Sequence, residues 1–263
     1  MRRVVFNQKG GVGKSTITCN MAAIGASEGL RTLVIDLDPQ ANATRYLRAR
    51  DATDEETAGG TAGFYRDTLG FSFSRRTLAD YIEATPFDNL DLLASSTELD
   101  DLAIKLESRY KMFKLREALD ALNDYDAVWI DTPPALNFYS RSALIAAERC
   151  LIPFDCDDFS RQALYALLDS IDEIRADHNN DLEIEGIVVN QFQSRARLPR
   201  QLVDQLRDEG LPVIDAFLSS SVRIRESHEQ ARPMVYLDRR HKLTGEFRAL
   251  HQVLQGAACT QGA

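Results

Sequence analysis

One short stretch near the start of the chain decides its fold: Lys9-Gly10-Gly11-Val12-Gly13-Lys14-Ser15-Thr16. An apolar run, Val4-Val5-Phe6, comes before it, and a helix-like stretch from Ser15 to about Ser27 follows it. A strand, a glycine-rich loop and a helix in this order surround the phosphates of a nucleotide with backbone N–H groups and a positive helix end. We therefore expect Gly10, Gly11, Val12, Gly13, Lys14, Ser15 and Thr16 to bind a nucleotide. Lys14 would reach its β- and γ-phosphates, and the Ser15 hydroxyl would ligate Mg²⁺.

The rest of the chain alternates short apolar runs with helical stretches, which is typical of a parallel sheet covered on both faces. Strands are expected at 3–7, 31–36, 90–94, 126–131, 149–154, 185–190 and 212–216. Helices are expected at 15–28, 77–84, 99–107, 112–123, 140–147, 160–176, 198–209, 222–231 and 243–255. The prediction is an α/β fold with a mostly parallel, doubly wound sheet. We expect a single domain over 1–255, followed by a short tail over 256–263. Residues 49–76 are expected to form an exposed loop.

Composition limits the possible classes of protein. The chain has 263 residues and a formal net charge of −9, which taken whole argues against a nucleic-acid binder. Residues 1–185 carry 20 Lys and Arg against 32 Asp and Glu, whereas residues 186–263 carry 11 against 8. This asymmetry can mark one face for a polyanion, although a balanced surface explains it equally well. The four cysteines show no disulfide or zinc spacing, and no signal peptide or long apolar run is found. We therefore expect a cytoplasmic protein.

Two aspartates end predicted strands beside the phosphate loop. Ligands of such sheets bind outside the carboxyl ends of the strands, where Asp131 and Asp36 both lie. A carboxylate at Asp131 suits Mg²⁺, usually through a water molecule. Asp36 is expected to orient the hydration shell of the ion, but a carboxylate at a strand end can instead cap the following turn.

Three sequence blocks together resemble those of the ParA/MinD family of ATPases, and the chain looks most similar to a small, Soj-like ParA. The first block is the loop Lys9–Thr16, which is similar to the family's deviant Walker A box with its early lysine. The second is Val34-Ile35-Asp36-Leu37-Asp38-Pro39-Gln40, and the third is Trp129-Ile130-Asp131-Thr132-Pro133-Pro134. They occur in the family's order and at a similar spacing. The resemblance runs from about Arg3 to Leu254 and is weakest at 48–76.

The resemblance implies an ATPase that hydrolyses ATP to ADP and phosphate with Mg²⁺ and works as a homodimer. Asp38 matches the aspartate that positions or polarises the attacking water. Lys9 matches the lysine that crosses into the partner subunit, where a cation neutralises charge on the transferred phosphoryl group. Asn190, which ends another strand, resembles the family's adenine-binding asparagine, although a turn-forming role competes.

The segment Ser219–Glu226 resembles a family stretch whose arginine contributes to sequence-independent DNA binding. Arg223 is the matching residue, and Arg225 could extend the patch. Further candidates are Arg195, Arg197, Arg200, Arg239, Arg240 and Lys242. The resemblance then implies a nucleoid-associated switch that segregates or positions DNA or a protein cargo. A ParB-like or other partner protein would stimulate its hydrolysis.

The sequence supports other functions less well. A MinD-like membrane association would use a C-terminal amphipathic helix, and Leu243, Phe247, Leu250, Val253 and Leu254 do lie at helical spacing. That helix carries few basic residues, so packing on the sheet is the simpler explanation and no stable membrane association is expected. An ATPase that acts on a protein or metabolite without DNA is a further alternative. An iron–sulphur reductase, a tyrosine kinase and an amidoligase are disfavoured because their characteristic sequence features are missing.

Overall fold

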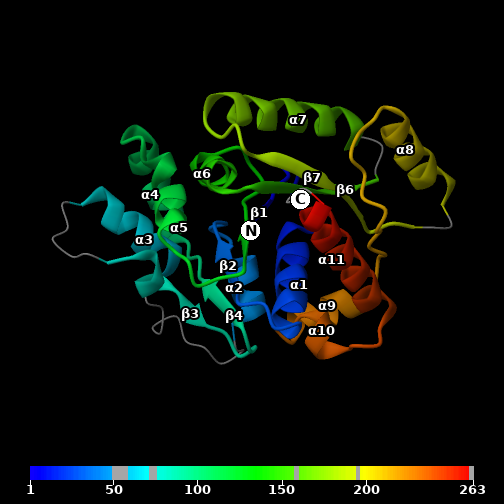
Figure 1. Ribbon diagram of the computed structural model, residues 1–263, viewed down its shortest axis with the longest axis horizontal. Helices are drawn as coiled ribbons and strands as arrows, with labels where there is room; N and C mark the ends of the chain where they lie inside the picture. Colours follow the sequence, from blue (N-terminus) through cyan, green and yellow to red (C-terminus); the bar gives the residue numbers. More distant parts are fainter. Residues whose placement is uncertain (49–58, 71–75, 157–159, 194–195, 261–263) are drawn as a thin grey trace.

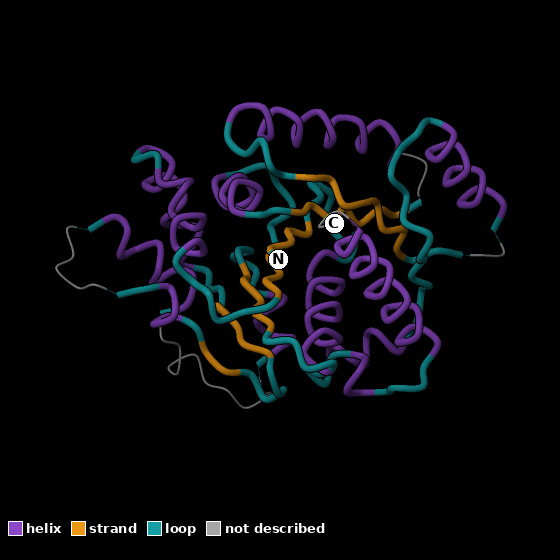
Figure 2. The backbone as a smooth tube through the Cα atoms, in the orientation of Figure 1, coloured by secondary structure: helices purple, strands orange, loops and turns teal. Residues whose placement is uncertain are grey.

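A seven-stranded sheet forms the centre of the molecule, and helices cover both of its faces (Figure 1, Figure 2). The computed structural model describes residues 1–48, 59–70, 76–156, 160–193 and 196–260. The strand order is β3-β4-β2-β5-β1-β6-β7, and every neighbouring pair is parallel except β3 with β4. The strands are β1 (Arg2–Val5), β2 (Thr32–Asp36), β3 (Glu83–Ala84), β4 (Leu90–Leu93), β5 (Ala127–Asp131), β6 (Arg149–Asp155) and β7 (Glu183–Asn190). The predicted fold class is confirmed.

Two helical layers sandwich this sheet, and each layer has its own hydrophobic core. The first contains α3 (Gly60–Leu69), α4 (Glu98–Ser108), α5 (Lys114–Asp120), α6 (Phe138–Ala146), α7 (Ser160–Asp177) and α8 (Arg197–Asp208). The second contains α1 (Lys14–Ser27), α2 (Asn42–Leu47), α9 (Arg223–Glu229), α10 (Met234–Leu237) and α11 (Lys242–Thr260). The 3₁₀ helices η2 (Leu78–Tyr81) and η3 (Lys111–Phe113) pack against the first core.

The central strands supply both cores because successive side chains of a strand point to opposite faces of the sheet. In β1, Val4 packs into the first core and Val5 into the second. In β5, Ile130 and Trp129 divide in the same way, and all four side chains are at most 2% exposed. Burial on both faces explains why these strands read as continuous apolar runs.

The expected loop over 49–76 is wrong in its second half. Residues 60–69 form helix α3, whose Phe64 and Tyr65 are buried in the first core. The helix was missed because glycine and threonine dominate its first turn, where sequence propensity disfavours a helix. Residues 49–58 and 71–75 lie outside the described part of the chain.

Two other element predictions also need correction. The helix expected over 77–84 is only the 3₁₀ turn η2 followed by the two-residue strand β3, which pairs with β4. The strand expected over 212–216 contributes a single bridge, between Val213 and Ile187. The final helix is longer than expected, since α11 continues to Thr260.

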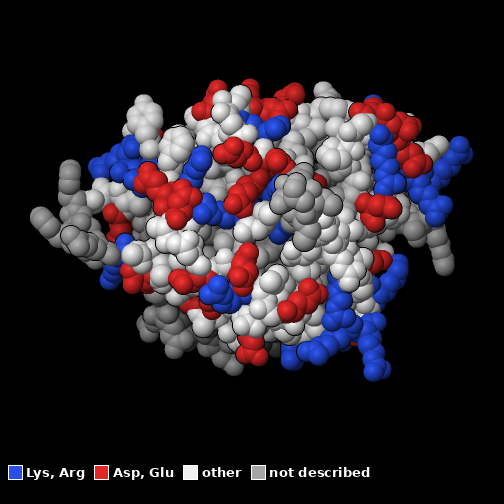
Figure 3. All heavy atoms as spheres, viewed as in Figure 1, with Lys and Arg blue, Asp and Glu red and all other residues white. Residues whose placement is uncertain are grey.

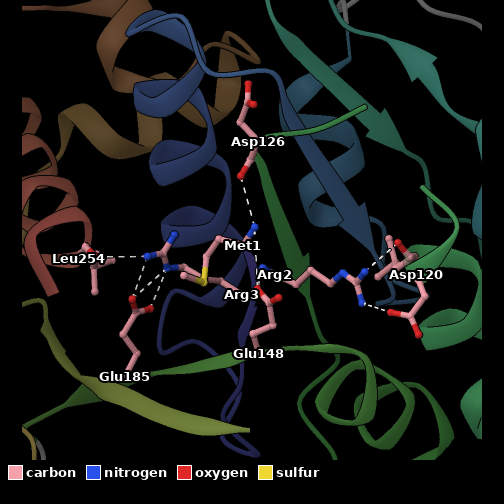
Figure 4. Close-up of polar contacts among 9 residues, drawn as sticks. Met1, Arg2, Arg3, Asp120, Asp126, Glu148, Glu185 and Leu254 are labelled. Atoms are coloured by element: carbon pink, nitrogen blue, oxygen red, sulfur yellow. Dashed lines mark hydrogen bonds and ion pairs between the residues drawn. The ribbon is translucent and has the colours of Figure 1, made fainter. Parts of the chain in front are cut away.

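A buried ion pair joins the first strand to the last strand and to the last helix (Figure 4). The Arg3 guanidinium donates to both carboxylate oxygens of Glu185, with Nε–Oε2 at 2.8 Å and Nη2–Oε1 at 2.9 Å. It also donates to the Leu254 carbonyl at 3.3 Å and lies 5.3 Å from the ring centroid of Trp129. The Arg3 and Glu185 side chains are 2% and 5% exposed. The neighbouring pair Arg2–Asp120 is more exposed, at 21% and 58%.

Removing one member of the buried pair should destabilise the fold strongly. Arg3→Met leaves Glu185 as an uncompensated buried charge, so we expect a loss of about 3–5 kcal/mol in the free energy of unfolding. Arg2→Met is the matched control, with an expected loss of at most about 1 kcal/mol. Urea unfolding of both variants measures the difference. Equal losses in the two variants would contradict this account of Arg3.

Candidate nucleotide site

The phosphate loop runs from the end of β1 into α1 with a left-handed turn at Gly13. Gly13 caps the helix with φ +92°, a conformation that favours glycine. A Cβ atom there would lie 2.3 Å from Nδ2 of Asn190, so packing against β7 also requires glycine. The turn exposes the N-terminal end of a 14-residue helix, whose first N–H groups have no partners within the helix. This is a site for an anion.

Lys14 holds the loop together from within. Its ammonium donates to the Lys9 carbonyl at 3.0 Å, and Lys14 as a whole is only 7% exposed. Burial lowers the pKa of Lys14, while the charges of Asp131 and Asp38 oppose this shift. The Lys9 residue is half-buried, and its backbone N–H donates to Oδ1 of Asn7 at 2.9 Å.

Asp36 and Asp131 lie side by side at the carboxyl edge of the sheet, because β2 and β5 pair with these two residues in register. The Asp36 carboxylate is used within the protein. Its Oδ1 accepts from the Asp38 N–H at 3.0 Å, and its Oδ2 accepts from the Thr44 N–H and hydroxyl, each at 2.8 Å. Asp36 therefore makes the turn-capping contacts that were expected as the alternative to its role near the metal ion.

Asp131 differs from Asp36, because neither of its buried oxygens has a hydrogen-bond partner among the described residues. Burial raises the pKa of Asp131 well above its usual range, and the charges of Asp36 and Asp38 add to the rise. The nearby Ser15 hydroxyl and the charge of Lys14 oppose the rise. Burial likewise raises the pKa of Asp36 to about 6.

These groups form a donor set that fits Mg²⁺. A hard cation takes oxygen ligands, and Asp131 offers two oxygens that nothing else in the described structure uses. A buried carboxylate without a partner is costly unless a cation compensates it. Ser15, at the start of α1, can supply the hydroxyl ligand.

Two cavities open beside the loop. The first, of about 600 Å³, is lined by loop residues, by Asp38, Gln40, Asn42, Arg45 and Tyr46 of the segment after β2, and by Pro134 and His228. The second, of about 320 Å³, lies between Gly11, Gly13, Thr16 and Asn190 on one side and the segment Ser219–Val222 with Arg225 on the other. Thr16 lines both cavities, so a ligand whose phosphates bind the loop in the first cavity could extend into the second.

Several predicted site residues line these cavities: Gly10, Gly11, Gly13, Lys14, Ser15, Thr16 and Asp38 line the first, and Asn190 and Arg225 line the second. Neither lining includes Lys9, Val12, Asp36, Asp131 or Arg223. Asn190 donates from Nδ2 to the Val12 carbonyl at 2.9 Å, so it braces the loop, and its predicted contact with adenine stays a prediction. Sequence reasoning missed Thr44, Tyr46 and His228. The helix-forming run after Gln40 could have indicated the first two, whereas nothing in the sequence places His228 beside Thr16.

The predicted DNA-binding arginines lie on α9, next to the second cavity. Arg223 is paired with two carboxylates, Glu226 and Asp238. Arg225 is exposed, and among the described residues its guanidinium has no ion-pair partner. Lys and Arg side chains gather over α9, α10 and the start of α11 (lower right in Figure 3). The further candidates there are Arg239, Arg240 and Lys242, while Arg195 lies outside the described residues.

Fold and site define a P-loop nucleotide-binding protein of the α/β class. A family model described as an AAA domain matches residues 3–184. The chromosome partitioning protein ParA of Myxococcus xanthus is 32% identical over 253 residues, which cover 95% of this chain and 86% of that protein. The sporulation initiation inhibitor protein Soj of Bacillus subtilis is 30% identical, with 90% and 91% covered. The chain belongs to the ParA family of partition proteins.

A solved structure with the same fold carries a nucleotide. Cobyrinic acid a,c-diamide synthase from Mycobacterium smegmatis, with bound ADP and magnesium, superposes with a TM-score of 0.75 at 25% identity, over 88% of this chain and 90% of that one.

None of the helices in the described part of this chain is long and apolar enough to cross a membrane.

The raised pKa of Asp131 gives a prediction for stability. A carboxyl whose pKa is higher in the folded state costs stability as pH rises from about 4, its unfolded value, through the folded value. Asp131→Asn removes this cost. Without nucleotide and in EDTA, we expect the variant to be more stable than the wild type by at least about 1 kcal/mol at pH 8, with a smaller difference at pH 5. Urea unfolding at both pH values measures this, and a difference that does not grow with pH would contradict it.

Proposed function

We propose that this chain is a Mg²⁺-dependent ATPase that dimerises with ATP, binds DNA without sequence preference in that state, and segregates or positions DNA or a protein cargo. The observation that carries the proposal is the second cavity, which the phosphate loop lines together with α9, the helix that bears Arg223 and Arg225. A group bound in this cavity would contact both the nucleotide loop and the helix that bears Arg225. A ParB-like or other partner protein would stimulate hydrolysis, and the protein would then be released from the nucleoid DNA.

The roles at the site follow from position and charge. Mg²⁺ would neutralise charge on the β- and γ-phosphates, and Ser15 and Asp131 would hold it, with Asp36 fixing the segment beside it. Lys14 would shift from the Lys9 carbonyl to the phosphates. In hydrolysis, a water oxygen would bond to the γ-phosphorus as the bond from that phosphorus to the β,γ-bridging oxygen breaks, which gives ADP and phosphate and releases a proton of the water to solvent.

Asp38 is the residue that we assign to the attacking water. It is 5% exposed and lines the first cavity. Its Oδ1 accepts from the Gln40 N–H at 2.9 Å, and its carbonyl accepts from the Ser95 hydroxyl at 2.7 Å. The first contact orients the carboxylate and the second holds the backbone of Asp38, while Oδ2 has no hydrogen-bond partner among the described residues. That oxygen could orient the water.

Lys9 would act across the dimer. It starts the loop at the rim of the site, and a cation delivered to the partner subunit's nucleotide would make hydrolysis depend on association. The ATP-bound dimer would bring the arginines of both subunits to one face.

This role predicts the behaviour of two variants. Asp38→Ala should accumulate a dimer with Mg-ATP, because the water is no longer positioned. Adding Lys9→Ala should return the protein to a monomer, because the contact across the interface is lost. Light scattering after size-exclusion chromatography, with Mg-ADP as the control, measures both masses. A double variant that still dimerises with Mg-ATP would refute the role of Lys9.

The two α9 arginines should differ in their effect on DNA. Arg225 is exposed and unpaired in the described structure, whereas Arg223 is engaged by Glu226 and Asp238. Phosphate contacts confer affinity without sequence information and weaken as salt rises.

We therefore expect Arg225→Ala to weaken ATP-dependent DNA binding more than Arg223→Ala does. Each lost phosphate contact should reduce the slope of log affinity against log salt by about 1 per subunit. Fluorescence anisotropy with a duplex of arbitrary sequence, over a salt series, measures affinity and slope. Unchanged binding after replacing both arginines would contradict this assignment.

Packing of the last helix disfavours the MinD-like alternative. Leu243, Phe247, Leu250 and Leu254, which form its apolar stripe, are at most 3% exposed and lie in the second core. Of the five apolar residues that lie at helical spacing in this helix, only Val253 is exposed, at 43%. A stripe used for packing is not available to a lipid surface, so DNA remains the proposed surface.

A further inference from the structure

His228 lies where the two cavities meet, and it is part of the lining of both. Its Nε2 is 2.9 Å from the Thr16 hydroxyl, in the first turn of α1. Its ring stacks on Tyr46 with centroids 4.1 Å apart and an angle of 26° between the planes. The imidazole is exposed, so these two contacts fix a side chain that otherwise faces solvent.

The support beneath His228 is rigid. Tyr46 is 1% exposed, and its hydroxyl is 2.5 Å from Oγ of Ser227 and accepts from Nδ2 of Asn20 at 3.1 Å. Oδ1 of Asn20 accepts from the Met234 N–H at 2.8 Å. Helices α1, α2 and α9 therefore meet at one buried phenol, and Asn20 links α10 to it. His228 is the exposed edge of that junction.

We infer that His228 contacts the bound nucleotide and thereby ties occupancy of the phosphate loop to the position of α9. Phosphates at the start of α1 lie beside Thr16, and a phosphate oxygen or ribose hydroxyl that approaches Thr16 comes within reach of His228 Nε2. An imidazole N–H donates to either group. The inference rests on the nucleotide binding of the proposed function and requires neither hydrolysis nor DNA.

The contact would have a consequence for the DNA-binding surface. His228 and Arg225 are on the same short helix, one turn apart. A ligand oxygen bound by the imidazole would hold the same turn of α9 that Ser227 ties to Tyr46, so that α9 would be held at two points. Nucleotide binding would thus set the position of Arg225.

Calorimetry of the full chain tests the contact directly. His228→Ala should weaken Mg-ADP binding about tenfold or more, as expected for a lost hydrogen bond to a charged group, and His228→Gln should restore most of the affinity. Glu229→Ala, an exposed neighbour on the same helix, is the control and should bind as the wild type does. Magnesium pyrophosphate serves as a second ligand. An equal loss with both ligands assigns the contact to a phosphate, and a loss with ADP alone assigns it to the ribose.

Two further readouts separate a ligand contact from a structural role. The ¹³Cε1 resonance of His228 should shift when Mg-ADP binds, while that of His251, which faces Glu28 on the far end of α1, serves as the reference. Amide exchange over 223–229 should slow with Mg-ADP in the wild type and not in His228→Ala.

The inference is overturned if wild type and His228→Ala bind Mg-ADP equally, or if the His228 resonance does not move. It is also overturned if His228→Ala unfolds at a lower temperature without ligand and His228→Gln restores that temperature but not the affinity. A wild type that binds no Mg-ADP would instead refute the proposed function.

Discussion

The excess of buried carboxylate at one edge of the sheet is the constraint on which the rest of the structure depends. Asp36 and Asp131 end neighbouring strands in register, Asp38 lies two residues further on, and Lys14 is the cation that reaches them from the loop. The protein satisfies Asp36 with backbone and hydroxyl donors but leaves Asp131 without any among the described residues. Burying a charge without a partner is costly, and natural proteins retain such costs mainly at functional sites. The stability lost there is recovered when a cation and its phosphates bind.

Hydrogen bonds at the same edge connect the nucleotide site to α9, the helix that carries Arg223 and Arg225. The segment after β2 carries Thr44, which holds Asp36, and two residues later Tyr46, which supports α9. Direct contacts therefore connect the phosphate loop and the segment after β2 to α9, the helix that carries Arg225. Of these contacts, the one between His228 and Thr16 is the one that a ligand would replace under the inference above.

Sequence reasoning predicted the sheet and the phosphate loop because both depend on local patterns. Apolar strands buried on two faces, as in β5, and a glycine loop between strand and helix are visible without tertiary information. It failed at 60–69, where tertiary burial of Phe64 and Tyr65 stabilises a helix that local propensity disfavours. It also could not decide between the two roles of Asp36, because the donor is Thr44, eight residues away. The contact of His228 with Thr16 spans 212 residues, and no local signal could reveal it.

The most direct test of the account is to measure binding of the wild-type chain to non-specific duplex DNA and to anionic liposomes, with Mg-ATP or Mg-ADP, across a salt series. The account predicts binding to DNA with Mg-ATP only, with an affinity that falls steeply as salt rises, and no binding to liposomes. Binding to liposomes alone, or to neither surface with Mg-ATP, would contradict it.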